Sequence, residues 1–326
     1  MSEQTNNYTL EFEKPIKDLE NQIKDLEEAS KKPHIDLSAE VKALQKKAEF
    51  LLKDIYQNLS IWERVQLSRH PNRPHYVDYI ENIFEDFHEL KGDRHFANDP
   101  SVIGGFGYIA GEKVCVIGIE KGRKTKEKVL RNFGMPRPEG YRKAIRLMEM
   151  AGRFNIPVVT FVDTPGAYPG IGAEERGQSA AIAENIMEMF DIPTPIISVI
   201  IGEGGSGGAL GIAVADDVQM LEYSIYSVIS PESCASILWG DPKRAEQAAN
   251  ALQLSPNKAM DLGIIDGIVS EPLGGAQRSP KKVYDNVTTM LSDKIKELKK
   301  LSTEDLLNKR FEKFRKIGNH TIHGIN

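Results

Sequence analysis

The chain has 326 residues, of which 40% are hydrophobic and 27% charged, and its 42 lysines and arginines against 47 aspartates and glutamates give a formal net charge of −5. This composition is typical of a soluble globular protein and excludes a fibrous or largely disordered chain. Two cysteines cannot form a disulfide framework or a four-thiolate zinc site, and no apolar stretch approaches the ~20 residues of a membrane span. The first ten residues are polar and have no apolar signal-peptide core. From these features together we expect a cytoplasmic protein with no metal of its own and no membrane partner.

The first 60 residues predict two amphipathic helices. Apolar residues recur at alternating steps of four and three between residues 12 and 26, and again between residues 41 and 55, which is the spacing of one helix stripe. Pro33 lies between the two stripes and interrupts the helix. Residues 1–60 are therefore predicted to form a helical hairpin, an interaction arm toward another subunit or toward the body of the same chain.

Residues 61–278 are predicted to form an α/β body. The pattern stays helical over residues 60–89, and residues 102–109 and 113–119 then predict a strand hairpin. Helices and strands alternate beyond it, which favours helices layered on a sheet. We expect helices at 141–154 and 176–190, and strands at 157–162, 195–201, near Val218, near Tyr226 and at 263–269. Residues 279–326 are predicted to be a basic helical tail.

Residues 202–208 hold five glycines in seven positions, directly after the predicted strand 195–201. They match two familiar patterns: the G-x-G-x-x-G dinucleotide fingerprint, with Gly202, Gly204 and Gly207, and the G-x-S-x-G nucleophile elbow around Ser206. Only the histidines at 320 and 323 follow Ser206, which disfavours a hydrolase triad of this type. The short helix after the glycines disfavours dinucleotide binding, although an NAD-dependent oxidoreductase stays open as an alternative.

A third interpretation of the glycines needs only the backbone. Consecutive glycines at a strand-to-helix turn can aim two N–H groups and a helix dipole at one oxygen, which forms an oxyanion hole. A second loop, residues 163–170, follows the preceding strand and contains Gly166. Both loops are expected at the same edge of the sheet, where they would share a cleft.

Residues 121–146 form a basic segment, with ten lysines and arginines against two glutamates. A local charge of this sign on an acidic protein predicts an anionic partner, such as phosphates, carboxylates or an acidic protein surface. The segment has no nucleic-acid recognition motif and no aromatic ladder, so nucleic acid is not expected as the primary partner.

Several longer stretches are informative when taken together: Gly92-Asp93-Arg94, Val102-Ile103-Gly104-Gly105, Lys121-Gly122-Arg123-Lys124-Thr125-Lys126-Glu127, Arg131-Asn132-Phe133-Gly134-Met135-Pro136, Pro138-Glu139-Gly140-Tyr141-Arg142-Lys143, Glu174-Glu175-Arg176-Gly177-Gln178, Glu271-Pro272-Leu273-Gly274-Gly275 and both glycine-rich loops. Together they resemble one family, the alpha subunits of bacterial acetyl-CoA carboxylase carboxyltransferases. The resemblance spans residues 92–275 and departs from the expected pattern at Ser233, where glycine is usual.

The resemblance implies an α/β, crotonase-like (ClpP/crotonase) fold, a β-β-α spiral with an N-terminal helical hairpin and trailing C-terminal helices. It also implies a beta subunit that supplies the acetyl-CoA side and a zinc ribbon, usually in an α2β2 heterotetramer. Biotin would be carried covalently on the biotin carboxyl carrier protein and not on this chain. ATP would be used by the separate biotin carboxylase of the wider complex.

The reaction that the resemblance implies is transfer of a carboxyl group from carboxybiotin to acetyl-CoA, giving malonyl-CoA, the first step of fatty acid synthesis. Negative charge develops on the ureido oxygen of biotin and on the acetyl enolate, so two oxyanion holes are needed. The resemblance assigns the enolate to the beta subunit and the ureido oxygen to the N–H groups of Gly204 and Gly205.

Further site residues follow from the same resemblance. Gly166, Gly207 and Gly208 are expected at the substrate site, the last two at the start of the helix. Arg123, Lys124 and Lys126 are expected to contact the CoA phosphates or the carrier protein. The alternative within the fold is a self-contained acyl-CoA hydratase or decarboxylase, with Glu203, Glu174 or Glu175 as its acid or base.

Overall fold

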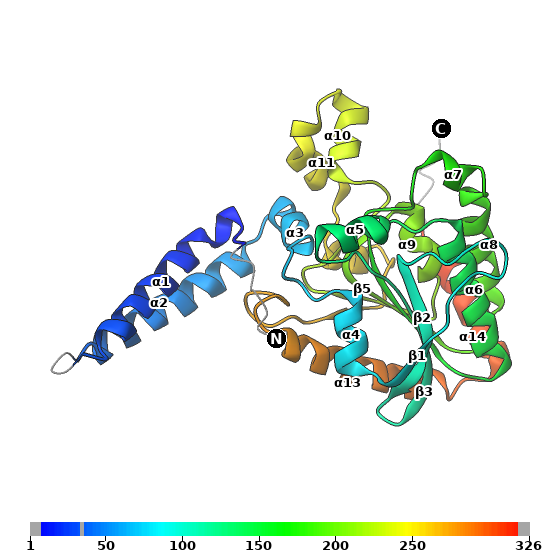
Figure 1. Cartoon of the computed structure of the whole chain (residues 1–326), viewed down its shortest axis with the longest axis horizontal. Helices are drawn as coiled ribbons and strands as arrows, with labels where there is room; N and C mark the ends of the chain where they lie inside the picture. Colours follow the sequence, from blue (N-terminus) through cyan, green and yellow to red (C-terminus); the bar gives the residue numbers. More distant parts are fainter. Residues whose placement is uncertain (1–7, 33–35, 319–326) are drawn as a thin grey trace, which may run out of the picture.

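A central sheet of eight strands organises the body of the protein, which a computed structural model describes over residues 8–32 and 36–318 (Figure 1). The strand order is β1-β2-β3-β4-β5-β6-β8, and β7 pairs with β5. β1 to β3 are antiparallel neighbours, whereas the pairs from β3 onward are parallel. The strands are β1 (Glu85–Glu89), β2 (Val102–Ile109), β3 (Glu112–Ile119), β4 (Val158–Thr164), β5 (Ile196–Gly205), β6 (Asp217–Leu221), β7 (Ile225–Ser227) and β8 (Gly267–Val269).

Helices connect these strands and flank the sheet. They are α1 (Lys14–Ala29), α2 (Ser38–Gln57), α3 (Ile61–Ser68), α4 (Tyr76–Ile83), α5 (Thr125–Leu130), α6 (Pro138–Arg153), α7 (Ile171–Glu174), α8 (Gln178–Asp191), α9 (Ser206–Ala213), α10 (Pro231–Trp239), α11 (Ala245–Leu252), α12 (Pro256–Asp261), α13 (Pro280–Leu298) and α14 (Thr303–Lys316), with short 3-10 turns at Glu11–Glu13, Asn132–Gly134 and Pro242–Arg244. None of the helices formed by the described residues could cross a lipid bilayer, judged by length and apolar character.

Helices cover both faces of the central strands. Because side chains alternate along a strand, successive residues point into the two different cores. On β5, Ile196 and Ile200 belong to the core under α6, α8 and α9, whereas Ile197 and Val199 belong to the core under α4 and α13. The near-continuous apolar runs of the predicted central strands are explained by this double coverage. α13 packs into the second of these cores, since its residues Val283, Val287 and Leu291 are fully buried.

The N-terminal arm consists of α1 and α2, which lie side by side and project from the body (Figure 1). The two predicted helices are confirmed, and Pro33 between them lies outside the described residues, as do His320 and His323. The base of the arm packs on the body, where the Tyr56 ring contacts Tyr223. The Tyr56 hydroxyl donates to Glu13 Oε1 at 2.6 Å, which holds α2 to the turn before α1. The role of the arm in interaction, like the domain boundaries 1–60, 61–278 and 279–326, stays a prediction.

Three predicted elements differ from the structure. Residues 85–89 form the edge strand β1 and not a helix. The sequence did not indicate this strand because it pairs on one side only, and its mostly exposed residues show no alternation of apolar and polar side chains. The last strand of the body begins at Gly267 and not at Gly263, which lies in the turn directly after α12 with a φ of +68°. The strand predicted at 195–201 continues through Gly205, which changes the description of the glycine segment.

Candidate active site

The glycine segment is the end of a strand and the start of a helix, not a free loop. β5 runs through Gly205, and α9 begins at Ser206, whose φ of +55° makes the turn. Before the turn β5 pairs with β6 at residues 197–200, and at residues 203–205 it pairs with β7. The strand therefore changes neighbours within the glycine segment, a place where α/β sheets commonly bind ligands.

The register between β4 and β5 is irregular at the same place. Val162 pairs with Ile200 and Thr164 pairs with Gly204, so two residues of β4 are matched by four residues of β5. The extra residues make a bulge in β5 just before Gly204. Bulges of this kind are frequent beside active sites, where they redirect the backbone.

The two glycine-rich loops lie against each other, as the sequence predicted. A Cβ on Gly205 would stand 2.3 Å from the Pro165 carbonyl oxygen, and a Cβ on Gly208 would stand 2.4 Å from the Gly166 carbonyl carbon. Glycine is required at both positions because the backbones approach so closely. A Cβ on Gly207 would instead be 3.6 Å from the Ile182 side chain, which is an ordinary contact.

Gly204 and Gly205 line a small pocket at the end of β5. The other lining residues come from β5, the loop after β4, β7, the segment from β7 to the start of α10, and the segment after α3: Glu203, Pro165, Ile225, Ser227, Ile229, Ser230, Pro231 and Arg69. The two predicted oxyanion residues thus share a concave site, but their N–H groups as ligands of a ureido oxygen stay a prediction. Gly166, Gly207 and Gly208 do not line this pocket: Gly166 and Gly208 lie in the contact between the loops, and Gly207 faces the Ile182 side chain.

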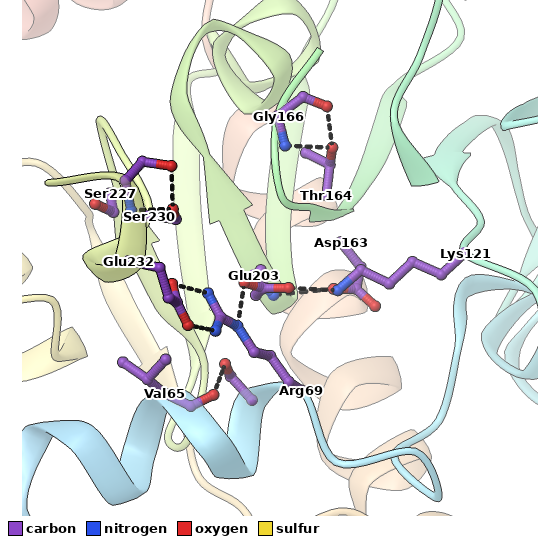
Figure 2. A network of polar contacts seen from close by, with 12 residues as sticks. Val65, Arg69, Lys121, Asp163, Thr164, Gly166, Glu203, Ser227, Ser230 and Glu232 are labelled. Carbon is purple, nitrogen blue, oxygen red and sulfur yellow. Dashed lines mark hydrogen bonds and ion pairs between the residues drawn. The ribbon is translucent and has the colours of Figure 1, made fainter. Parts of the chain in front are cut away.

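Charged side chains surround the end of β5 in one connected network (Figure 2). The Lys121 Nζ lies 2.6 Å from Asp163 Oδ1 and 2.9 Å from Glu203 Oε2. From the other side, Arg69 Nε lies 2.6 Å from Glu203 Oε1, and Arg69 Nη1 lies 2.5 Å from Glu232 Oε1. Both oxygens of the buried Glu203 carboxylate are therefore paired with cations.

The network determines what Glu203 can do. Burial raises the pKa of the Glu203 carboxyl, but the charges of Lys121 and Arg69 outweigh burial and hold this pKa below its ordinary value. An ionised carboxylate with both oxygens occupied is poorly suited to be a general acid or base near neutral pH. Glu174 and Glu175 are exposed on and beside α7, away from the pocket lining. The self-contained hydratase or decarboxylase is therefore not favoured.

The basic segment divides into internal and external cations. Arg123, Lys124 and Lys126 are exposed at the start of α5, where Arg123 pairs with Asp78, and none of the three lines the pocket. Other cations of the segment serve the interior. The fully buried Lys143 is one example, since its Nζ donates to Asn98 Oδ1 at 2.8 Å and to the backbone oxygens of Asp99 and Val102. Packing thus uses part of the charge of the segment inside the protein, and an anionic partner for its exposed cations stays a prediction.

The sequence interpretation missed the segment between α3 and α4, which crosses the end of β5. Arg69 binds Glu203 there, and Arg73 Nε donates to the Ile201 carbonyl oxygen at 3.1 Å. Two arginines, two histidines and two prolines in residues 69–75 break the helical period, and this break was the available signal. Within residues 8–32 and 36–318, no group of three or more His, Cys, Asp or Glu side chains is placed to hold a metal.

Comparison with known proteins identifies the family. A family model described as acetyl co-enzyme A carboxylase carboxyltransferase-like matches residues 9–318. The acetyl-coenzyme A carboxylase carboxyl transferase subunit alpha of Geobacter metallireducens is 56% identical over 310 residues, covering 95% of this chain and 97% of the relative. The subunit of the same name from Actinobacillus pleuropneumoniae serotype 5b is 54% identical over 310 residues, covering 95% of this chain and 98% of the relative.

Solved structures show the same fold at low sequence identity. The transcarboxylase 12S structure with methylmalonyl-coenzyme A bound superimposes with a TM-score of 0.58 at 18% identity, and the beta subunit of P. aeruginosa geranyl-CoA carboxylase with 0.54 at 17%. The matches cover 84% and 74% of this chain but only 46% of each solved chain, so the chain spans about half their length. The predicted crotonase-like fold is thereby confirmed. By its sequence relatives and its family match, the chain belongs to the acetyl-CoA carboxylase carboxyltransferase family.

Proposed function

We propose that this chain supplies the carboxyl-donor half of a shared carboxyltransferase site, in which a carboxyl group passes from carboxybiotin to acetyl-CoA and gives malonyl-CoA. The observation that carries the proposal is the position of Gly204 and Gly205 at a bulged strand end, lining a pocket beside the start of α9. Backbone donors in such a place stabilise a developing oxyanion without any titrating side chain.

Packing requires glycine at both proposed oxyanion positions. A Cβ on Gly204 would stand 2.8 Å from the Tyr226 ring, and a Cβ on Gly205 would stand 2.3 Å from the Pro165 carbonyl oxygen. Biotin supplies the carboxyl carrier and a ureido oxygen that becomes charged as the carboxyl group leaves. The Gly204 and Gly205 N–H groups would hold that oxygen, and the start of α9 would add its dipole.

The partners in this proposal follow from the names of the relatives, which are alpha subunits. A beta subunit would bind the acetyl-CoA thioester, hold the enolate and carry zinc, in an α2β2 assembly. Biotin would arrive on the carrier protein, and the exposed Arg123, Lys124 and Lys126 would meet that protein or the CoA phosphates. Biotin carboxylase would recharge the carrier, and the complex would work in the cytoplasm.

The reverse reaction tests the proposal directly. Malonyl-CoA and free biocytin would be mixed with this chain alone, with the beta subunit alone and with both, and acetyl-CoA release would be followed. We expect release that depends on biocytin only in the mixture. Release from this chain alone would make it a self-contained acyl-CoA enzyme, and NAD(H) binding by the isolated chain would support the oxidoreductase alternative.

A further inference from the structure

A strained turn presents a phenylalanine to solvent directly after α5. Asn132, Phe133 and Gly134 all have positive φ, of +48°, +56° and +75°. Two of them are not glycine, and a left-handed backbone costs free energy for a residue that carries a side chain. Phe133 is nevertheless 50% exposed, so burial inside the chain uses only part of its ring. An exposed aromatic side chain on a strained backbone is a feature expected at a contact with another molecule.

The turn is fixed to the edge of the sheet at which the pocket lies. A Cβ on Gly134 would stand 2.6 Å from Lys121 Cγ and 3.2 Å from the Asp163 carbonyl oxygen, so the turn packs on the end of β4. The Tyr168 N–H donates to the Pro136 carbonyl oxygen at 3.0 Å, which joins the same segment to the loop after β4. The turn is therefore held beside the loops of the active site, although none of its residues lines the pocket.

α5 packs on the end of the neighbouring strand β3 (Figure 1). A Cβ on Gly122, three residues after β3, would stand 2.7 Å from the Glu127 carbonyl carbon in the middle of α5. Glu127 Oε2 accepts the backbone N–H groups of Arg123 and Lys124 at 3.0 and 3.2 Å, which fixes the start of the helix. Both α5 and the turn after it are thus held at the edge where the parallel strands end.

Exposed apolar and basic side chains accompany Phe133. Val129 and Leu130, at the end of α5, are more than half exposed, and Lys124 and Lys126 are exposed at its start. These five residues form the α5 patch. It combines an apolar part with positive charge on a protein whose net charge is negative, which suits an acidic surface that carries an apolar contact.

The exposure of the α5 patch favours a protein over a small ligand. Sites for small molecules are concave and bury most of the ligand. Val129, Leu130 and Phe133 are each at least half exposed, and none of them lines the pocket at the end of β5. CoA is therefore the less suitable occupant of this surface.

The size and charge of the α5 patch favour a transient partner. A stable interface takes about 20–30 residues from each protein and is depleted of charged residues at its centre. The patch has five residues, and two of them are lysines. Exposed charges of this kind speed association with an oppositely charged surface more than they hold a complex together. A carrier protein that binds and leaves in every cycle fits these properties better than a permanently assembled beta subunit.

We propose that the α5 patch docks the biotin carboxyl carrier protein, with Phe133 as the apolar anchor and Lys124 and Lys126 facing acidic residues of that protein. The inference rests on the proposed function and identifies the surface at which the carrier is received. Free biocytin reaches the pocket without this contact, so only the carrier depends on the patch.

The opposite edge of the sheet provides matched controls. Phe154 and Leu262 are 69% and 61% exposed, against 50% and 62% for Phe133 and Leu130. They lie in the connections that enter β4 and β8, at the edge where the parallel strands begin. Their substitution reports the effect of losing an exposed apolar side chain away from the pocket.

The experiment uses the complex of this chain with its beta subunit. We would compare Phe133→Asn with Phe154→Asn, and Leu130→Gln with Leu262→Gln, for assembly, Tm, and the KM values of biotinylated carrier, free biocytin and malonyl-CoA in the reverse reaction. Asparagine tolerates the left-handed backbone, so the turn keeps its shape. We expect Phe133→Asn to raise the KM for the carrier about tenfold, as loss of an interface anchor typically does, and Leu130→Gln about threefold. The KM values for biocytin and malonyl-CoA should stay within about twofold, and both controls should match the wild type.

Several outcomes would overturn the inference. They are an unchanged KM for the carrier in Phe133→Asn and Leu130→Gln, or an equal rise in the two controls. Loss of assembly would assign the α5 patch to the beta subunit, and a raised KM for malonyl-CoA would assign it to CoA, and each result excludes the carrier contact. Leu130→Gln decides the matter if Phe133→Asn fails to fold. A wild-type complex without biocytin-dependent activity would instead refute the proposed function, so the two failures are distinguishable.

Discussion

Arg73 and Glu271 form a bidentate ion pair inside the protein, with Arg73 Nη1 and Nη2 at 2.8 and 2.5 Å from the two Glu271 carboxylate oxygens. Their side chains are 4% and 0% exposed. Glu271 also accepts the backbone N–H groups of Tyr223 and Ala276, so it joins the turn after β6 to the segment after β8. The pair thus connects residues close to the end of β5 with the C-terminal part of the body.

Arg73→Met should strongly destabilise the protein. Removal of one partner leaves a buried carboxylate without its cation, which typically costs 3–5 kcal/mol. Denaturant unfolding would measure this cost. Lys299→Met is the matched control, because Lys299 pairs with Glu112 at the surface, where such pairs contribute about 0–1 kcal/mol. An equal effect of the two substitutions would contradict the structural role of the Arg73 pair.

Gly208→Ala should lower the Tm of the complex, whereas Gly207→Ala should leave it unchanged or raise it slightly. The added methyl group at 208 would meet the Gly166 backbone at 2.4 Å, and forced overpacking typically costs 1–3 kcal/mol. At 207 the nearest atom would be 3.6 Å away, and alanine favours the helical conformation over glycine. Thermal unfolding of both variants checks the prediction, and a lower Tm for Gly207→Ala than for Gly208→Ala would contradict it.

Lys143 should make stability rise with pH in alkaline solution. Burial lowers the pKa of the Lys143 amine to about 8, against 10.5 in the unfolded chain, although the Asp99 charge opposes this effect. Between these two values the unfolded chain binds a proton that the folded chain has lost, so the free energy of unfolding increases with pH. At 1.36 kcal/mol for each pH unit the gain is about 3 kcal/mol.

The measurement for Lys143 is urea unfolding from pH 7.5 to 10.5 for the wild-type chain and for Lys143→Met. The difference between the two isolates the contribution of Lys143 from the other titrating groups. We expect wild-type stability to rise relative to the variant across this window. A flat or falling difference would show that Lys143 keeps its proton in the folded state.

Charge reversal of Lys124 and Lys126 should weaken binding of the biotinylated carrier protein. Because exposed charges at the rim of an interface mainly steer association, the double variant Lys124→Glu/Lys126→Glu should raise the KM for the biotinylated carrier about tenfold, with the KM for free biocytin unchanged. Lys46→Glu/Lys47→Glu, on the exposed surface of α2, is the control with the same change of charge. A raised KM for malonyl-CoA would instead assign these lysines to the CoA phosphates.

The sequence predicted most of the regular elements because their signals are local. The hairpin of β2 and β3 follows from two apolar runs separated by Ala110-Gly111. Asp241 and Ser255 each precede a proline, and each accepts a backbone N–H at the start of the next helical segment, which is also a local signal. The glycine segment was recognised for the same reason, since five glycines within seven residues need no knowledge of distant partners. The contact between the two glycine-rich loops followed from the rule that parallel strands end at one edge.

The sequence by itself therefore determined most of the regular elements, the layered α/β class, the family and the glycines at the end of β5. Only the tertiary structure decided which charges serve the site. Arg69 and Glu203 are 134 residues apart in the chain, Lys121 and Glu203 are 82 apart, and such pairs leave no periodic signal. Likewise, the bulge that places the Glu203 N–H on Asp163 depends on the register of β5 against β4, because hydrogen bonds between strands are set by packing and not by the local composition of either strand.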